Sequence, residues 1–211
     1  MSGSREAILG TIRLALRDVP PDERAADVPV RRAYRHKADE AHEVLVDRFA
    51  ERVADYQAEV RRVAAADVSA AVGALLVERR VGRVVVPRGL PEQWWPDGVE
   101  VVVDDGSLST AELDAVDGAL TGCAVGIAET GTFVLDGGGR SGRRAVSLVP
   151  DYFLCLVEVD QVVGSVPEAI GRLDPQRPLT FVSGPSATSD IELRRVEGVH
   201  GPRTLDVLII D

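Results

Sequence analysis

Three short stretches combine glycine with polar side chains and so carry the residue types that could bind a small molecule. They span residues 126–140, 184–192 and 198–203. Glycines allow backbone N–H groups to approach an anion closely. An arginine can bind a carboxylate or phosphate through two parallel hydrogen bonds. We therefore expect the three stretches to meet at one site for a small anion such as a carboxylate.

The candidate residues come from all three stretches. Glu129 is the candidate catalytic group, because its carboxylate falls between two apolar segments that are predicted strands. His200 beside Asp190 would keep its proton to higher pH and favour an anion. The candidate ligand-binding residues are Thr130, Gly131, Arg140, Ser186, Thr188, Asp190, His200 and Arg203. Structural alternatives are a hairpin tip at Gly137–Gly139, a capped turn at Ser186–Asp190, and backbone hydrogen bonds for Glu129 and His200.

The composition excludes several classes of protein. A chain of 211 residues with 45% hydrophobic and 27% charged residues is typical of a globular domain. Its net charge of -10 argues against general nucleic-acid binding. No apolar run approaches the roughly 20 residues of a membrane helix, and the N-terminus has no signal-peptide core. We expect a cytoplasmic protein.

Rare residues narrow the chemistry further. Lys37 is the only lysine and lies in a charged stretch, so a Schiff-base mechanism is not expected. The Gly-Lys-Ser/Thr element of a phosphate loop is absent. Cys123 and Cys155 are fewer than the usual four thiolates of an iron–sulfur cluster, and their spacing fits no zinc motif. We expect both to be buried apolar side chains, and no cofactor in this chain.

Apolar periodicity predicts alternating helices and strands. Helices are predicted over 4–17, 39–65, 69–80, 109–120 and 166–173, and strands over 83–87, 100–104, 123–128, 132–135, 153–157, 179–182 and 205–210. The Pro-rich stretch 18–38 is a predicted loop. This pattern indicates an α/β sandwich with a largely parallel sheet, antiparallel in part after Gly131. We divide it into an N-terminal helical segment, 1–66, and an α/β domain, 67–211.

Strand ends then predict where the polar stretches lie. In open α/β sheets, ligands bind beyond the carboxyl ends of the strands. The strands at 125–128 and 180–182 would deliver Glu129 and Ser186 to the same edge. The 198–203 stretch precedes the last strand, so it must cross back over the sheet to join them.

Four motifs resemble the LUD-domain family over residues 68–211. They are Gly126-Ile-Ala-Glu-Thr-Gly-Thr132, Ser147-Leu-Val-Pro150, Gly184-Pro-Ser-Ala-Thr-Ser-Asp-Ile-Glu192 and Gly198-Val-His-Gly-Pro-Arg203. The resemblance implies a three-layer α/β/α sandwich similar to the NagB/RpiA/CoA-transferase group, here with an N-terminal helical extension. It also implies a part in oxidising L-lactate to pyruvate, together with partner proteins that carry the iron–sulfur clusters.

Two alternatives stay open. Glu129-Thr130-Gly131 is similar to the element of CoA transferases in which a glutamate nucleophile precedes a small residue and glycine. The chain would then be a free-standing CoA-transferase-like or sugar-phosphate isomerase-like enzyme. Alternatively, it would be a non-catalytic assembly or regulatory protein that docks through the helix predicted at 39–65.

Overall fold

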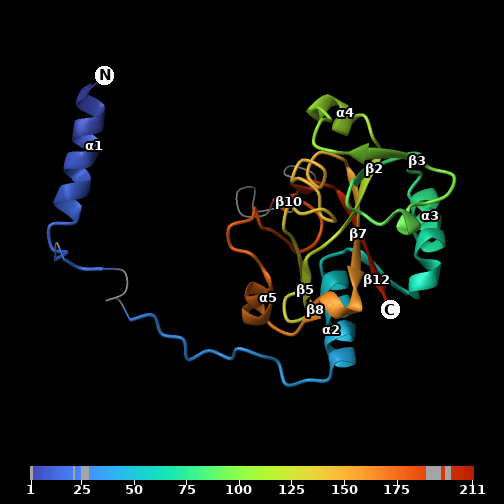
Figure 1. Ribbon diagram of the computed structural model, residues 1–211, viewed down its shortest axis with the longest axis horizontal. Coiled ribbons are helices and arrows are strands. Elements are labelled where there is room, and N and C mark those ends of the chain that lie inside the picture. The colour runs from blue at the N-terminus through green and yellow to red at the C-terminus, as the bar shows by residue number, and fades with distance from the viewer. Residues whose placement is uncertain (1, 21, 25–28, 189–195, 198–200) are drawn as a thin grey trace. The chain divides into compact units, whose positions relative to one another are not determined.

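The chain forms two compact units. The computed structural model describes residues 2–20, 22–24, 29–188, 196–197 and 201–211. The first unit, residues 1–34, contains helix α1 (Ser2–Ala15), which confirms the predicted N-terminal helix. Ile8 and Ile12 of this helix are exposed. Residues 35–211 form the second unit, which holds all the other helices and strands of the described chain (Figure 1).

The second unit alternates strands with helices. Its order is α2 (His42–Asp55), β1 (Glu59–Val63), η2 (Ala65–Asp67), α3 (Val68–Glu78), β2 (Arg83–Pro87), η3 (Glu92–Trp94), β3 (Glu100–Asp104), α4 (Thr110–Asp114), β4 (Gly118–Gly122), β5 (Val125–Ile127), β6 (Thr132–Leu135), β7 (Tyr152–Glu158), η4 (Val159–Gln161), β8 (Val162–Val163), α5 (Val166–Arg172), β9 (Thr180–Val182), β10 (Ala187–Thr188), β11 (Val196–Glu197) and β12 (Thr204–Ile210).

The main sheet has six parallel strands in the order β1-β12-β7-β4-β2-β3. Both faces are buried, which explains the continuous apolar runs in its strands. Along β7, Phe153 and Cys155 pack on the face covered by α2 and α4, whereas Leu154 and Leu156 pack on the face covered by α3. Figure 1 shows α2 and α3 on either side of β7 and β12. The predicted three-layer α/β/α architecture is confirmed.

A second, four-stranded sheet in the order β8-β5-β6-β9 packs against α2. Strands β5 and β6 form an antiparallel hairpin, so the antiparallel segment expected after Gly131 is confirmed. It belongs to this small sheet, not to the parallel one. Phe133 of β6 shares a core with Phe49 of α2, while Val134 faces the other way toward Ala169 of α5. The small sheet therefore lies between α2 and α5.

The helix predicted over 39–65 is wrong in its second half. Helix α2 ends at Asp55, Gln57 adopts a positive φ of 69°, and Glu59–Val63 is the edge strand β1. Val60 and Val63 fit a helical stripe by their spacing. In the strand their odd separation turns them to opposite faces of the sheet, one toward α2 and the other toward α3.

The helix predicted over 109–120 is also too long. The capping box of Ser109 and Glu112 is present, but α4 ends at Asp114, and Gly118–Gly122 is a central strand. This strand lacks a Val-rich run such as those of β2 and β3, and it contains small residues instead. They suit its position, because a Cβ on Gly118 would lie 2.7 Å from Cδ1 of Tyr152.

The observed division of the chain falls after residue 34, whereas the sequence suggested a boundary after residue 66. The difference arises because α2 buries Val46, Phe49 and Val53 in the main core, and because β1 belongs to the main sheet. The 35–41 segment is attached as well, since the N–H of Ala38 donates to Oε2 of Glu168 at 3.2 Å.

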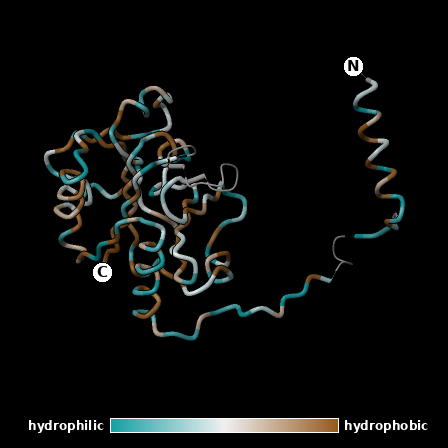
Figure 2. Tube along the Cα trace, turned by 180° about the vertical axis from the view of Figure 1, so that it is seen from behind, coloured by the Kyte–Doolittle hydropathy of each residue, from teal (hydrophilic) through white to brown (hydrophobic). Residues whose placement is uncertain are grey.

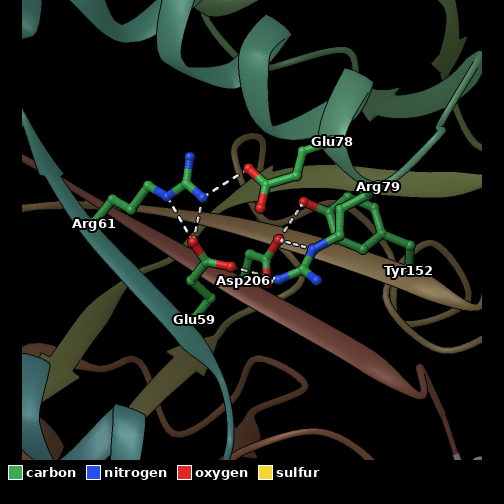
Figure 3. A network of polar contacts seen from close by, with 6 residues as sticks. All are labelled: Glu59, Arg61, Glu78, Arg79, Tyr152 and Asp206. Carbon is green, nitrogen blue, oxygen red and sulfur yellow. Dashed lines mark hydrogen bonds and ion pairs between the residues drawn. The ribbon is translucent and has the colours of Figure 1, made fainter.

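A polar network joins β1, β7, β12 and α3 around the carboxylate of Asp206, which is only 1% exposed (Figure 3). Arg79 donates from Nε and Nη2 to its two oxygens at 2.8 and 2.7 Å, and Tyr152 donates from its hydroxyl at 2.9 Å. Nη2 of Arg79 also reaches Glu59 at 2.7 Å. Burial, followed by the charge of Asp206, raises the pKa of Tyr152, so its hydroxyl stays protonated as a donor.

Replacing Asp206 by alanine should destabilise the chain by about 3–5 kcal/mol, because Arg79 and Tyr152 would lose their buried acceptor. Chemical unfolding would measure the loss. The matched control is Glu78→Ala, which removes a network carboxylate that pairs with Arg61 in an exposed position. That variant should change stability little. Equal effects of the two substitutions would show that burial does not set the contribution of Asp206.

Limited trypsin digestion should cut between residues 18 and 38 first. Pro20, Pro21 and Pro29 lie in this stretch, and residues 29–34 are exposed and belong to no helix or strand. Figure 2 shows the segment that leads into α2 mainly in hydrophilic colours. Exposed polar backbone opens at low cost. Mass spectrometry should find a resistant fragment that begins near Arg35, and early cleavage within 68–180 would contradict this expectation.

Candidate functional site

Two of the predicted polar stretches lie at the carboxyl ends of strands in the small sheet, and these strand ends lie on the same side. Strands β5 and β9 run in the same direction, because each is antiparallel to β6. The turn after β5 and the turn after β9 are joined through hydroxyl groups. Thr130 Oγ1 donates to Thr132 Oγ1 at 2.8 Å, and Thr132 Oγ1 lies 2.7 Å from Ser183 Oγ. The turns after β5 and β9 are therefore close together, as inferred from strand direction, at the carboxyl ends of these two strands.

Helix α2 and its C-cap residue pack against both turns, and each contact requires a glycine in the turn. Gly131 has φ 59°, and a Cβ there would lie 2.5 Å from the carbonyl carbon of Arg52. Gly184 has φ 85°, and its Cβ would lie 2.5 Å from Cβ of Tyr56. Only glycine combines these backbone angles with so close an approach.

Glu129 lies in the first turn with its carboxylate half exposed. Oε1 is 3.5 Å from Nη2 of Arg35, and the two side chains are 51% and 55% exposed. Its N–H donates to the carbonyl of Gly164 at 3.1 Å, so the backbone is fixed while the side chain faces water. An exposed ion pair of this kind binds weakly and can exchange partners.

Beyond β9 the chain borders a cavity of about 170 Å³, which we call the Arg144 cavity. Its lining is Arg144, Ser147, Leu148, Phe153, Thr180–Ser186, Gly201, Pro202 and Leu205. Arg144 donates from Nη1 to Thr180 Oγ1 at 2.7 Å, and Ser147 Oγ donates to the carbonyl of Arg144 at 3.2 Å. Phe153 and Leu205 are buried and supply an apolar wall. The cavity thus combines a cation, hydroxyl groups and an apolar surface.

Arg203 lies beside a different cavity. That second cavity, of about 460 Å³, is lined by Gln57–Glu59, Arg79, Pro185 and Arg203–Asp206. Nε of Arg203 is 3.6 Å from Oδ1 of Asp151, and its N–H donates to the carbonyl of Asp151 at 2.9 Å. Pro185 lines both cavities, so the two are neighbours, but Arg203 does not line the Arg144 cavity.

Arg140 lies at the other end of the main sheet. Its guanidinium pairs with Glu158, the last residue of β7, and stacks 5.2 Å from the ring centroid of Trp94. Arg203 contacts Asp151, just before the first residue of β7. Seven strand residues at about 3.3 Å each separate the two positions by roughly 20 Å. Arg140 and Arg203 therefore do not hold one small ligand together.

The structure describes the remaining candidate residues to different extents. Asp190 and His200 lie outside the described residues, and of Thr188 only the backbone, in β10, is described. Ser186 lines the Arg144 cavity, and its N–H donates to the carbonyl of Pro202 at 2.9 Å. Gly137–Gly139 border a third depression at the carboxyl ends of β2 and β3, together with Arg88 and Arg143.

The sequence patterns did not identify the cation of the Arg144 cavity. Arg144 stands four residues beyond Arg140, just outside the polar stretch 126–140. Ser147 was noted only as the first residue of a family motif. In the structure Arg144 and Ser147 lie in one turn region, where the N–H of Val146 donates to the carbonyl of Arg143. Thr180 falls within the strand predicted at 179–182, and Ser183 lies between that strand and the polar stretch 184–192.

The parallel sheet between two layers of helices, with a small sheet carrying the turns, defines an α/β/α sandwich protein. Residues 33–210 match the model of the LUD domain, so the chain belongs to the LUD-domain family. It is 48% identical over 170 residues to Lactate utilization protein C of Deinococcus radiodurans, covering 79% of each chain. It is 30% identical over 135 residues to Lactate utilization protein C of a Geobacillus strain, covering 58% of this chain and 55% of that protein.

A solved structure shares the fold. The crystal structure of a DUF162-family protein from Deinococcus radiodurans, at 1.70 Å resolution, matches with a TM-score of 0.71 and 40% identity. The match covers 82% of this chain and 99% of that one. Within the described part of the chain, no helix has the length and apolar character needed to cross a membrane.

Gly131→Ala should destabilise the chain by at least about 1–2 kcal/mol, because alanine is strained at φ 59° and its Cβ would collide with α2. The matched control is Gly171→Ala in α5, where a Cβ meets nothing within 4 Å. That change should be neutral or stabilising by up to about 1 kcal/mol. Chemical unfolding of both variants measures the difference, and an unchanged Gly131→Ala protein would show that the turn has room to move.

Proposed function

We propose that this chain is a non-redox component of a lactate utilization system. It would support the oxidation of L-lactate to pyruvate with partner proteins that hold iron–sulfur clusters, and it would bind a small carboxylate. The observation that carries the proposal is the 48% identity to Lactate utilization protein C over 79% of both chains. The protein would work in the cytoplasm and hold no redox cofactor of its own.

The chemistry of its two cysteines supports a non-redox role. Cluster ligands are thiolates, usually four of them. Cys123 and Cys155 are the only cysteines of the chain, and both are buried. Burial raises the pKa of the Cys155 thiol well above its usual value, which favours the protonated form. Among the residues with described positions, no group of three or more His, Cys, Asp or Glu side chains is arranged to hold a metal.

The proposal predicts that lactate oxidation requires this chain but does not occur on it. A strain that lacks the gene should fail to grow on L-lactate, and a plasmid copy should restore growth. The purified chain alone should contain no iron and reduce no dye with L-lactate, whereas extract of the complemented strain should reduce it. Robust dye reduction by the isolated chain would overturn the non-redox assignment, and normal growth of the deletion strain would overturn the role in lactate use.

The same preparations test the transferase alternative. If the isolated chain turned over an acyl-CoA or a sugar phosphate, and Glu129→Gln abolished that turnover, the chain would be an autonomous enzyme instead. Glu129→Gln keeps the size of the side chain and removes its charge. Since Glu129 is exposed, the variant is expected to fold normally.

A further inference from the structure

We infer that the Arg144 cavity is the carboxylate-binding site, and that it takes a 2-hydroxy or 2-oxo monocarboxylate of about three carbon atoms. This inference rests on the proposed function for the choice of carboxylate, while the site itself follows from the charge, size and lining of the cavity. It moves the anionic group from Arg203, where the sequence suggested it, to Arg144.

The charge balance around the cavity selects an anion. The chain has an excess of acidic residues, and most of the described arginines of the second unit pair with a carboxylate, as Arg79, Arg143 and Arg203 do. Arg144 differs. Among the described residues it donates only to the hydroxyl of Thr180, and no carboxylate pairs with it. The described residues that line the cavity include no Asp or Glu, so a bound carboxylate would supply the missing countercharge.

The second cavity is a poorer anion site by the same criterion. Its arginines already face carboxylates, because Arg79 is bound by Asp206 and Glu59, and Arg203 lies near Asp151. Asp206 and Glu59 themselves line that cavity and would repel an anion. Both arginines of the network in Figure 3 are thus paired with carboxylates of the same network, which leaves no unpaired positive charge for an anionic ligand.

Size and lining set the class of carboxylate. A cavity of about 150 Å³ holds a six-membered carbon ring, so 170 Å³ accommodates the six non-hydrogen atoms of lactate or pyruvate. Phe153, Val182 and Leu205 offer an apolar surface for a methyl group. Ser147 and Ser183 provide hydroxyls on the same lining, suited to the carboxylate and to an oxygen on the second carbon. Dicarboxylates would place a second charge against the apolar surface, which is unfavourable.

The test is calorimetric titration of the full chain with L-lactate and with pyruvate. Arg144→Ala should weaken binding roughly ten- to hundredfold, as expected for the loss of a charge-assisted contact. Arg144→Lys keeps the charge without the planar fork, so its affinity should fall between the two. The matched control is Arg172→Ala, which removes an exposed arginine that donates to the carbonyl of Asp160 and lines none of the three cavities. Its affinity should equal that of the unmodified chain.

Several results would overturn the inference. They are wild-type affinity in an Arg144→Ala protein, loss of binding only in Arg203→Ala, tighter binding of malate than of lactate, and no saturable binding of either monocarboxylate by the unmodified chain. Thermal unfolding of each variant without ligand separates lost binding from lost folding. Growth on lactate with the Arg144→Ala gene separates the two proposals. If the chain binds lactate in vitro but the deletion strain still grows on lactate, the proposed role is refuted and the site is not. If the deletion strain fails to grow but the Arg144→Ala gene restores growth, the site is refuted and the role is not.

Discussion

A carboxylate almost completely shielded from water, that of Asp206, fixes how the main sheet is assembled. A buried charge is tolerated only when paired and hydrogen-bonded, and the partners of Asp206 come from the C-cap of α3 and from β7. Moving β12 by one residue would turn this carboxylate to the opposite face of the sheet, into the apolar core beside α2. The requirement for Arg79 and Tyr152 therefore specifies the register of β12, and with it the position of the chain that enters the strand.

That entry point is where the Arg144 cavity lies. Phe153 and Leu205 are the second residues of β7 and β12, whereas Thr180 and Val182 come from β9 of the small sheet. The cavity is thus built where the two sheets meet, beside the amino ends of the parallel strands. This differs from the usual position at their carboxyl ends. The small sheet explains this unusual position of the cavity, because the carboxyl ends of its strands β5 and β9 lie at this junction.

The sequence revealed the parts of the fold that depend on continuous apolar runs, and it failed where two patterns compete. Strands β2, β3, β7 and β12 are Val-, Leu- or Ile-rich and were predicted within a residue or two of their bounds. Strand β1 was missed because Val60 and Val63 extend the stripe of α2, and nothing local shows that Gln57 turns the chain. Strand β4 was missed because Gly118–Gly122 is rich in small residues. These residues allow close packing in the centre of the sheet but have a low propensity for strands.

The candidate site was predictable to a similar degree. The meeting of the turns after β5 and β9 followed from strand direction alone. Which arginine faces the cavity did not, because Arg140, Arg144 and Arg203 are chemically identical and differ only in the carboxylates near them. Those carboxylates, Glu158 and Asp151, are distant from Arg140 and Arg203 in the sequence. Tertiary contacts, not residue type, thus decide which arginine is left for a ligand.

The ion pairs on β1 have a consequence for the colloidal behaviour of the protein. Strand β1 is an edge of the six-stranded sheet, and an unpaired edge is a template for addition of another chain. It carries Glu59, Arg61 and Arg62 within five residues, held in place by Glu78, Asp211 and the acidic side chains of α2. An incoming strand would have to break these pairs and strip water from their charges. The charges that anchor β1 therefore also protect this edge of the sheet from pairing with another chain.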